Sequence, residues 1–402
     1  MTIYHRDLDC PLTMLTTLAI ANYRSLRDLV LPLQQLNVIT GANGSGKSSV
    51  YRALRLLAET AQGGLIPALA REGGLQSTLW AGPENISRAM LEGRHEVQGT
   101  RRKEAVNLRL GFASDASSYL IDLGLPTKSD MPSAFMLDPH IKRECIWSGP
   151  FLRRGGLFAE RAGAVVKVKD GAGEWRVLSA ALATFDSMLT QLGDMRDGVE
   201  MLQLREQVRS WRFYDHFRTD ADAPARRAQI GTHTPVLSND GHDLAAAIQT
   251  IIEIGDADAL HEAVDDAFPG AALEIGGNDG RFELFMQQHG LLRPMRTSEL
   301  SDGTLRYLLW IAALLTPRPP ELLVLNEPET SLHPDLLAPL GRLMGKAARH
   351  SQIIAVSHAG GLIASLENQR GYQSICLEKE FGATRVVGMR ELEKPAWHWT
   401  TR

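Results

Sequence analysis

The chain has 402 residues, of which 44% are hydrophobic and 22% are charged, and its formal net charge is −4. These values are ordinary for a globular protein; they exclude a low-complexity chain and do not indicate a strongly basic nucleic-acid binder. The longest apolar run, residues 307–315, is too short to span a bilayer, and the charged N-terminal stretch differs from a signal peptide. We therefore expect a cytoplasmic protein with no membrane partner.

The cysteines and the short basic runs do not indicate a specific functional site. Cys10, Cys145 and Cys376 lie far apart and form no CxxC pair. This pattern favours a reducing compartment and argues against a disulfide framework or a zinc site. Basic runs occur at 101–103, 153–154 and 226–227. We interpret them as solvated surface, with contact to phosphate as the alternative.

The first half of the chain is predicted to be mostly β-structure around one glycine loop. Strands are expected at residues 15–23, 27–33 and 36–40, where apolar and β-branched residues alternate with short polar turns. A glycine loop at 41–49 is followed by a helical pattern over 50–61. Further β-like segments, typical of an antiparallel sheet, lie at 107–112, 118–125, 164–170 and 174–179.

The second half alternates helices with buried strands. Helices are predicted at 181–212, 243–255, 303–315 and 336–348, and buried strands at 321–327 and 351–359. Such β–α–β alternation indicates a parallel sheet with right-handed crossovers. Because the parallel-sheet segments lie at both ends of the chain, we predict one domain over 1–402 with a large insertion. Its parts would be an N-terminal lobe (14–130), an insertion or lid (131–290) and a C-terminal lobe (291–402).

The glycine loop matches GxxxxGK[ST], the phosphate-binding loop of ATP- and GTP-binding proteins. Glycines let the loop curl so that its backbone N–H groups and the following helix N-terminus face one phosphate chain. Lys47 would reach the β- and γ-phosphates, and the Ser48 hydroxyl would ligate Mg²⁺. Strand, loop and helix follow in the order that this site requires. The predicted ATP ligands of the loop are Gly41, Asn43, Gly44, Ser45, Gly46, Lys47, Ser48 and Ser49.

A second set of motifs follows in the C-terminal lobe. Residues 300–304, LSDGT, precede the predicted helix at 303–315, and alone they indicate only an N-cap. The next buried strand ends in Asn326 and Glu327, and SLHP follows at 331–334. A further strand ends in Ser357 and His358, where a sensor of the γ-phosphate is expected.

Taken in order, these motifs resemble the ABC-type ATPase heads of the SMC and RecF class, and more closely the RecF-like "predicted AAA family ATPases" of bacteria. The matching stretches are NYRSL (22–26), GANGSGKSS (41–49), LSDGT (300–304), LNEPETSLHP (325–334) and VSH (356–358). The resemblance implies an α/β P-loop NTPase fold of ABC/SMC-head type. That fold has a mixed, mainly parallel core sheet, an antiparallel β subdomain and an inserted helical/β region.

The resemblance also assigns roles to individual residues. In such families two heads enclose two ATP molecules, so the resemblance implies a homodimer. Ser301 and Gly303 would contact the γ-phosphate of ATP held by the other head, and Glu327 would polarise the attacking water. His358 would contact the γ-phosphate in its own head. Asn22 and Arg24 match the NYRSL stretch and are assigned to ATP.

Two residues depart from the family pattern. Asp302 places an acid in the signature, and Asn326 stands where an aspartate usually helps to hold Mg²⁺. Asparagine keeps an oxygen ligand but removes a negative charge. Losing a catalytic base typically costs about 10²–10⁴-fold, whereas weakening an outer metal contact costs about 10–100-fold. Because Glu327 is present, and Glu329 lies nearby, we predict a slow but competent ATPase.

Other signals have simpler interpretations. Residues 127–130, TKSD, match a guanine-reading motif but lack its context. Residues 211–220 mix aromatic and basic residues, and packing onto the core is favoured over base stacking. Asp240, His242 and Asp243 are better explained by a polar turn than by a metal site.

Three functions remain open. The stretch at 201–211 is too short for a coiled-coil arm, so the chain is a compact head. It could be a DNA-associated ATPase acting in DNA repair, with DNA as a partner. It could instead be a regulatory switch for a separate effector protein in a phage-defence or toxin system, or a nucleotide-binding scaffold without turnover.

Overall fold

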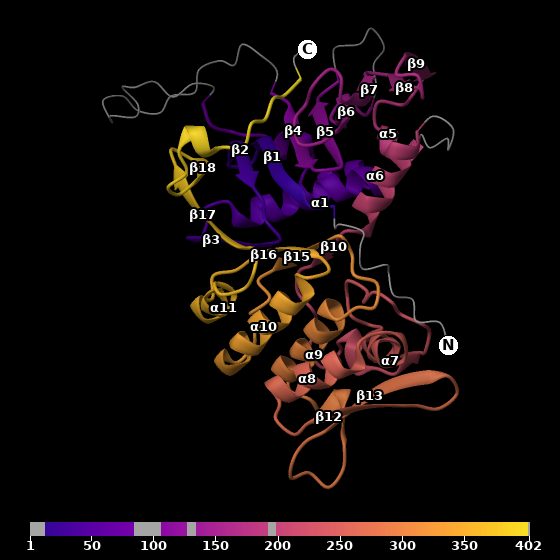
Figure 1. The fold of residues 1–402 in the computed structure, drawn as a ribbon, viewed down its shortest axis with the longest axis vertical. Helices are drawn as coiled ribbons and strands as arrows, with labels where there is room; N and C mark the ends of the chain where they lie inside the picture. The colour runs from indigo at the N-terminus through magenta and orange to yellow at the C-terminus, as the bar shows by residue number, and fades with distance from the viewer. Residues whose placement is uncertain (1–12, 84–105, 127–133, 192–197, 401–402) are drawn as a thin grey trace. The chain divides into compact units, whose positions relative to one another are not determined.

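The computed structural model describes residues 13–83, 106–126, 134–191 and 198–400 (Figure 1). These residues form two compact units, and each is discontinuous in sequence. The parallel-sheet unit comprises 35–39 and 212–374, and the antiparallel-sheet unit comprises the described parts of 13–34, 40–211 and 375–402. The three lobes expected from the sequence are a different division and stay a prediction.

An eight-stranded sheet dominates the antiparallel-sheet unit. Its order is β2-β1-β4-β5-β6-β7-β8-β9, and each neighbouring pair is antiparallel. The strands are β1 (Leu15–Tyr23), β2 (Leu26–Pro32), β4 (Leu108–Ser114), β5 (Ser117–Gly124), β6 (His140–Ser148), β7 (Leu157–Ala162), β8 (Val165–Lys169) and β9 (Trp175–Ser179). Strands β4 to β9 follow one another in chain order, whereas β4 pairs with β1 across the intervening residues 33–107.

Helices cover this sheet and complete the unit. α1 (Lys47–Gln62) buries Val50, Leu54 and Leu57 on its apolar side and packs against β1, β4 and α6. The others are α2 (Leu65–Arg71), α3 (Leu75–Thr78), α5 (Met188–Gln191) and α6 (Val199–Ser210). The end of β17 (Tyr372–Glu380) pairs with β18 (Ala383–Val386), and this hairpin lies beside β2.

The parallel-sheet unit is built on the strands predicted to carry the C-terminal motifs. β10 (Arg212–Tyr214), β15 (Leu322–Asn326), β16 (Gln352–Val356) and β3 (Leu36–Gly41) run parallel in that order, and residues 36–39 of β3 pair with β16. Asn326 pairs with Val356, and Val356 pairs with Ile39. The carboxyl ends of the three strands are therefore level.

Helices and a small sheet of the same unit lie on one side of these strands (Figure 1). α9 (Asp302–Leu314) is almost entirely buried, as is typical of a core helix apolar on all sides. The other helices are α7 (Leu244–Ile254), α8 (Ala257–Ala267), α10 (Leu337–Ala347) and α11 (Gly360–Leu366). The small antiparallel sheet contains β11 (Gln229–Ile230), β12 (Ala272–Gly276), β13 (Arg281–Gln287) and β14 (Met295–Arg296). No helix among the described residues is long and apolar enough to cross a membrane.

The predicted helix at 181–212 is wrong in part. Residues 180–187 form no helix, and helical structure is confined to α5 and α6 among the described residues of this stretch. Arg212 already belongs to β10, whose residues pair with Leu323–Leu325 of β15. At Arg212, pairing with a buried strand overrides the local helical preference. The stretch at 181–187 is held instead by contacts to the antiparallel sheet, because the carbonyl oxygens of Ala183 and Thr184 accept hydrogen bonds from Arg161 and from the N–H of Ile141. The strands predicted at 15–40 and the β–α–β alternation at 303–359 are confirmed.

A buried ion pair ties the middle of the antiparallel sheet to the segment before α5. Glu144 and Arg161 are fully buried, and Arg161 Nη1 lies 2.9 Å from Glu144 Oε2. The carboxylate also accepts hydrogen bonds from Tyr119 Oη (2.6 Å), Ser187 Oγ (2.6 Å) and Met188 N (3.0 Å). Burial and the charge of Glu144 raise the pKa of Tyr119 well above its ordinary value. The carboxylate is thus satisfied on both oxygens.

Replacing Arg161 with Met leaves that carboxylate buried without its counter-charge. We expect the free energy of unfolding to fall by about 3–5 kcal/mol, measured by urea unfolding followed by circular dichroism. The surface pair of Lys346 with Glu262 (3.0 Å) provides the control, and Glu262→Gln should cost less than about 1 kcal/mol. Equal losses for the two variants would show that the buried pair does not stabilise the sheet.

Candidate functional site

The glycine loop forms the conformation that its sequence predicts. Gly41, Gly44 and Gly46 have φ values of 137°, 80° and 112°, in the left-handed region that favours glycine. A Cβ on Gly41 would lie 2.2 Å from the carbonyl oxygen of Leu377, so this position also lacks space for a side chain. α1 begins at Lys47 with no side-chain cap, which leaves backbone N–H groups at its N-terminus for an anion.

Lys47 spans the mouth of this loop. Its Nζ donates to the carbonyl oxygens of Gly41 (2.6 Å) and Ala42 (3.1 Å), and the residue is only 7% exposed. The ammonium group is therefore held across the space that the curled loop encloses. Asn43, Gly44 and Ser48 are exposed, so the outer side of the loop and the hydroxyl expected to bind Mg²⁺ face solvent.

Thr384 holds the backbone of the glycine loop, and this role was not predicted from the sequence. Its Oγ1 donates to the carbonyl oxygen of Ser45 (2.7 Å) and lies 2.8 Å from Ser25 Oγ. A Cβ on Gly46 would come within 2.3 Å of this Oγ1. Because Thr384 lies on β18, more than three hundred residues after the loop, no local sequence signal could have identified it.

Asn22 and Arg24 lie in the same unit as the glycine loop, in strained backbone, and both side chains already have partners. Both have positive φ (62° and 51°). Asn22 Nδ2 donates to the carbonyl oxygen of Asn107 (2.9 Å), and Arg24 Nη2 lies 2.6 Å from Glu72 Oε2. Burial raises the pKa of Tyr23, whose hydroxyl donates to the same carboxylate. Arg24 would have to exchange Glu72 for ATP, so its role stays a prediction.

In the parallel-sheet unit, β15 ends at the two residues that the sequence singled out. Glu327 has φ 49°, a left-handed conformation uncommon outside glycine, and its N–H donates to the carbonyl oxygen of Val356 (2.8 Å). The backbone therefore turns at Glu327 while its N–H stays paired with the neighbouring strand. Asn326 Oδ1 is buried and has no hydrogen-bond partner among the described residues.

Glu329, the second carboxylate near Glu327, holds the turn after β16 with one of its oxygens. It is 8% exposed, and its Oε1 accepts hydrogen bonds from Ser357 Oγ (2.8 Å) and the His358 N–H (2.9 Å). His358 Nδ1 lies 3.4 Å from the same oxygen, while the imidazole is 62% exposed. The carboxylate therefore orients His358 with one side of its ring open.

The signature residues lie at the start of α9. Ser301 is the N-cap, and its Oγ accepts the N–H of Thr304 (3.1 Å). Asp302, the unexpected acid, pairs with Arg226 at 2.8 Å. Arg226 also donates to the carbonyl oxygens of Thr297 (2.7 Å) and Leu300 (2.8 Å). The guanidinium of Arg226 therefore offsets the negative charge of Asp302 and holds the backbone that leads into the signature. It is used inside the unit and not for a surface contact to phosphate.

Arg306 connects the signature helix to the loop after β15. Its Nη1 donates to the carbonyl oxygen of Thr330 (2.7 Å), and its Nη2 donates to that of Phe217 (2.8 Å). Phe217 is buried and packs edge-on against Trp310 with ring centroids 5.0 Å apart. The aromatic stretch 211–220 is thus part of the core, as the simpler interpretation held.

The remaining sequence candidates do not form a site. Asp240 and Asp243 accept hydrogen bonds within one turn before α7, and the hydrogen bond that His242 makes to Asp240 raises the pKa of His242. No cluster of three or more His, Cys, Asp or Glu side chains suited to a metal ion occurs in the part of the chain that the structure describes. The TKSD stretch at 127–130 and the basic run at 101–103 lie outside the described residues, as does Cys10.

Comparison with known proteins agrees with these motifs. Residues 175–364 match the family described as AAA domain, putative AbiEii toxin, Type IV TA system, and residues 14–116 match the AAA ATPase domain. No curated protein matches the sequence.

Solved structures show the fold. The chain is similar to an SMC head bound to the C-terminal winged-helix domain of ScpA, with 13% identity, a TM-score of 0.51, and 94% of this chain and 99% of that chain covered. The SMC head domain of Thermotoga maritima matches at 14% identity and a TM-score of 0.43, covering 94% of this chain and 99% of that chain. The first of these structures shows that the chain has the α/β fold of SMC heads, and together with the AAA matches it confirms the resemblance to ABC- and SMC-type AAA ATPases. The closer resemblance to RecF-like proteins stays a prediction.

The conformation of the loop predicts a sharp difference between two of its glycines. Gly41→Ala meets both a left-handed backbone and the carbonyl oxygen of Leu377, whereas Gly44→Ala meets nothing within 4 Å. We expect Gly44→Ala to lower the free energy of unfolding by about 1–2 kcal/mol, the cost of left-handed backbone alone. Gly41→Ala should lose more than this in the same urea titration, because the clash adds to it. Equal losses would mean that the close approach to Leu377 does not constrain the loop.

Proposed function

We propose that the chain binds ATP at the glycine loop and hydrolyses it slowly, as a DNA-associated ATPase whose dimer is opened and closed by the nucleotide. The observation that carries the proposal is the loop itself. Three glycines in left-handed backbone, an uncapped helix N-terminus and the constrained ammonium of Lys47 together suit a triphosphate. The AAA ATPase matches support ATPase activity in general.

The chemistry is assigned to three residues. Lys47 binds the β- and γ-phosphates. Glu327 orients the attacking water and accepts its proton, and it stands at the left-handed turn that ends β15. His358, oriented by Glu329, contacts the γ-phosphate with the open side of its ring.

Asn326 and Ser48 fit a role in holding Mg²⁺. The buried Asn326 Oδ1 lacks a partner among the described residues, as an oxygen awaiting a metal-bound water would, and Ser48 is exposed in the first turn of α1. Mg²⁺ bound with ATP neutralises charge on the phosphates. Asn326 supplies an oxygen but no charge, which is why we propose a weakly held ion and slow turnover.

The signature is proposed to act on ATP held by a second copy of the chain. Ser301 is exposed at the N-terminus of α9, and Gly303 presents backbone without a side chain next to it. An exposed helix N-terminus favours a phosphate from outside. With the charge of Asp302 offset by Arg226, this acid need not repel it.

One specific observation favours a second candidate function. The family matched over residues 175–364 is described by a putative AbiEii toxin and a Type IV toxin–antitoxin system. On this alternative the ATPase is a switch that holds a separate effector protein, and ATP hydrolysis times its release.

Phosphate release from Mg-ATP, with and without duplex DNA, separates these functions. We expect turnover that Lys47→Ala abolishes. Glu327→Gln should lower it by about 10²–10⁴-fold while ATP-bound dimers accumulate, measured by light scattering after size-exclusion chromatography. Stimulation by DNA supports the DNA-associated function, and turnover without stimulation favours the switch. Unchanged turnover in Glu327→Gln would overturn the assignment of the base.

Restoring a carboxylate at the metal position gives a separate test. Asn326→Asp should lower the Mg²⁺ concentration that gives half-maximal phosphate release, by about 10–100-fold, because a charged oxygen binds the ion more tightly. The exposed Asn278 provides the matched control, since Asn278→Asp adds the same charge elsewhere in the unit. An unchanged Mg²⁺ midpoint in Asn326→Asp would show that this residue does not contact the ion.

A further inference from the structure

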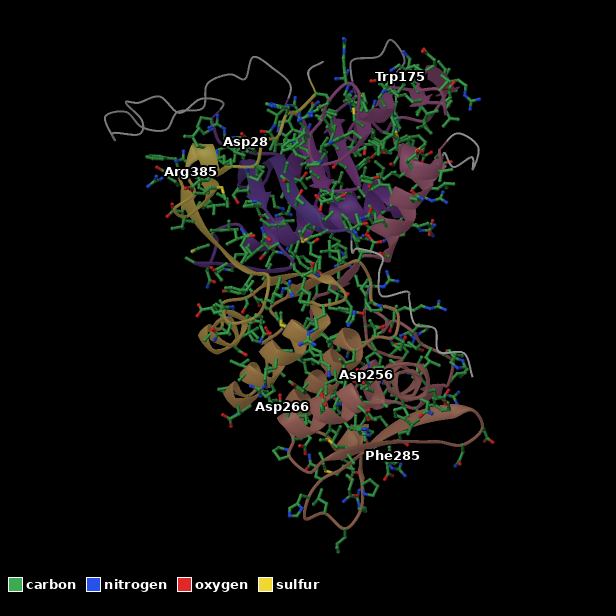
Figure 2. The ribbon with its side chains drawn as sticks, in the orientation of Figure 1. Asp28, Trp175, Asp256, Asp266, Phe285 and Arg385 are labelled. Carbon is green, nitrogen blue, oxygen red and sulfur yellow. The ribbon has the colours of Figure 1, made fainter. Side chains whose placement is uncertain are left out.

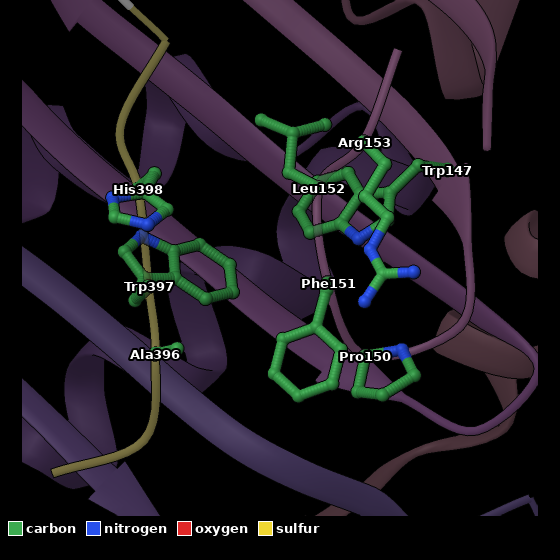
Figure 3. A pocket seen from close by; sticks show the side chains of 8 residues that line it. All are labelled: Trp147, Pro150, Phe151, Leu152, Arg153, Ala396, Trp397 and His398. Atoms are coloured by element: carbon green, nitrogen blue, oxygen red, sulfur yellow. The ribbon is translucent and has the colours of Figure 1, made fainter. Parts of the chain in front are cut away.

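A hollow of about 290 Å³ opens on the antiparallel-sheet unit, away from every ATP motif of that unit in sequence. Trp147, at the end of β6, and Phe151 and Leu152, in the loop that follows, form one side (Figure 3). Trp397, from the C-terminal segment, faces them across the hollow, and Arg153 and His398 add polar groups at its rim. Three aromatic rings therefore surround a space large enough for one flat group.

The sequence builds this hollow by placing a tryptophan over a glycine. A Cβ on Gly111 of β4 would lie 2.5 Å from the indole of Trp397, so only glycine admits the ring onto the sheet. Trp397 then packs against Trp147 and Trp399, with ring centroids 5.6 Å and 5.3 Å away. The C-terminal segment is thereby fixed at the sheet, and the wall that it contributes is preformed.

The segment around the hollow is basic, although the whole chain is acidic. Residues 142–176 contain eight Lys and Arg but only four Asp and Glu, in a chain of net charge −4. Glu144 and Arg161 are buried against each other, so seven basic and three acidic residues of this stretch remain to charge the surface. Arg153 lies over the Phe151 ring at 5.7 Å, and Lys169 lies over the Trp175 ring at 5.5 Å.

Two of these rings are open to solvent. Phe151 is 49% exposed, and Trp175, labelled at the β8–β9 hairpin in Figure 2, is 41% exposed. Exposed aromatic faces beside basic side chains are the combination with which proteins bind single-stranded nucleic acid: the rings stack on bases and the cations follow the phosphates.

We propose that this surface binds single-stranded nucleic acid, with one base in the hollow between Trp397 and Phe151 and the adjacent phosphates on Arg153 and Arg154. This inference rests on the DNA-associated function proposed above and specifies which form of nucleic acid is bound. The binding itself needs no ATP. Its success or failure is therefore measured separately from ATP hydrolysis.

The test uses fluorescence anisotropy with the full chain, no ATP, and a labelled oligothymidine of about 20 nucleotides. We expect Phe151→Ala to weaken binding by about 5- to 100-fold, as for the loss of one stacked base. Phe185→Ala, which removes an exposed ring (56%) elsewhere in the same unit, is the matched control and should leave the affinity unchanged. Arg153→Ala should weaken binding and reduce its salt dependence between about 50 and 200 mM, whereas Arg209→Ala on α6 should do neither.

Three results would overturn the proposal. The first is no binding of the oligonucleotide by the parent chain at low salt. The second is binding that Phe151→Ala and Phe185→Ala weaken equally. The third is binding that is as tight for duplex as for single-stranded DNA and that Phe151→Ala does not change. In the second and third cases the chain contacts the phosphates alone, and the hollow is left for a partner polypeptide.

Discussion

The register of three parallel strands is the constraint on which the ATP motifs of the parallel-sheet unit depend. Asn326 pairs with Val356, and Val356 with Ile39, so β15, β16 and β3 reach the same level. The hydrogen bonds from Glu327 N to Val356 and from Ser357 N to Ile39 continue the pairing one residue beyond it. Each strand is followed at once by a predicted ATP motif. A slip of one residue would turn the side chains of a buried strand to the other face and displace its motif.

Buried charged residues hold the loops that carry the C-terminal motifs. Glu329 fixes the turn that carries His358, and Arg226 gathers the carbonyl oxygens that lead into the signature. Thr384 does the same for the glycine loop with a neutral hydroxyl. Each of these residues forms hydrogen bonds with the backbone of the loop. It therefore fixes the conformation of the loop and does not itself contact a ligand. Loops with such supports are pre-organised, and binding need not spend free energy on ordering them.

The glycine loop and the strands before the motifs could be predicted from the sequence, because their determinants are local. Left-handed glycines, an alternating apolar pattern and a helix start lie within about 30 residues of one another. Glu72, Thr384 and Arg226 could not be found in this way, since each meets its partner only after the chain has folded. The helix predicted at 181–212 was wrong in part for the same reason, because long-range contacts of Ala183 and Thr184 with the antiparallel sheet and the pairing of Arg212 with β15 decided those residues. The nucleotide roles of Asn22 and Arg24 remain predictions.

The two departures from the family pattern act in opposite directions on charge. Asn326 removes one negative charge from the strand end where the ion is proposed to bind, and Asp302 adds one to the signature. Only the second is compensated, because Arg226 lies 2.8 Å from Asp302, whereas Asn326 Oδ1 has no partner among the described residues. A strand end with less negative charge repels the phosphates less while holding their cation less tightly. We therefore expect ATP still to bind and the rate of hydrolysis to be reduced. Such a balance suits a protein that spends most of its time with nucleotide bound.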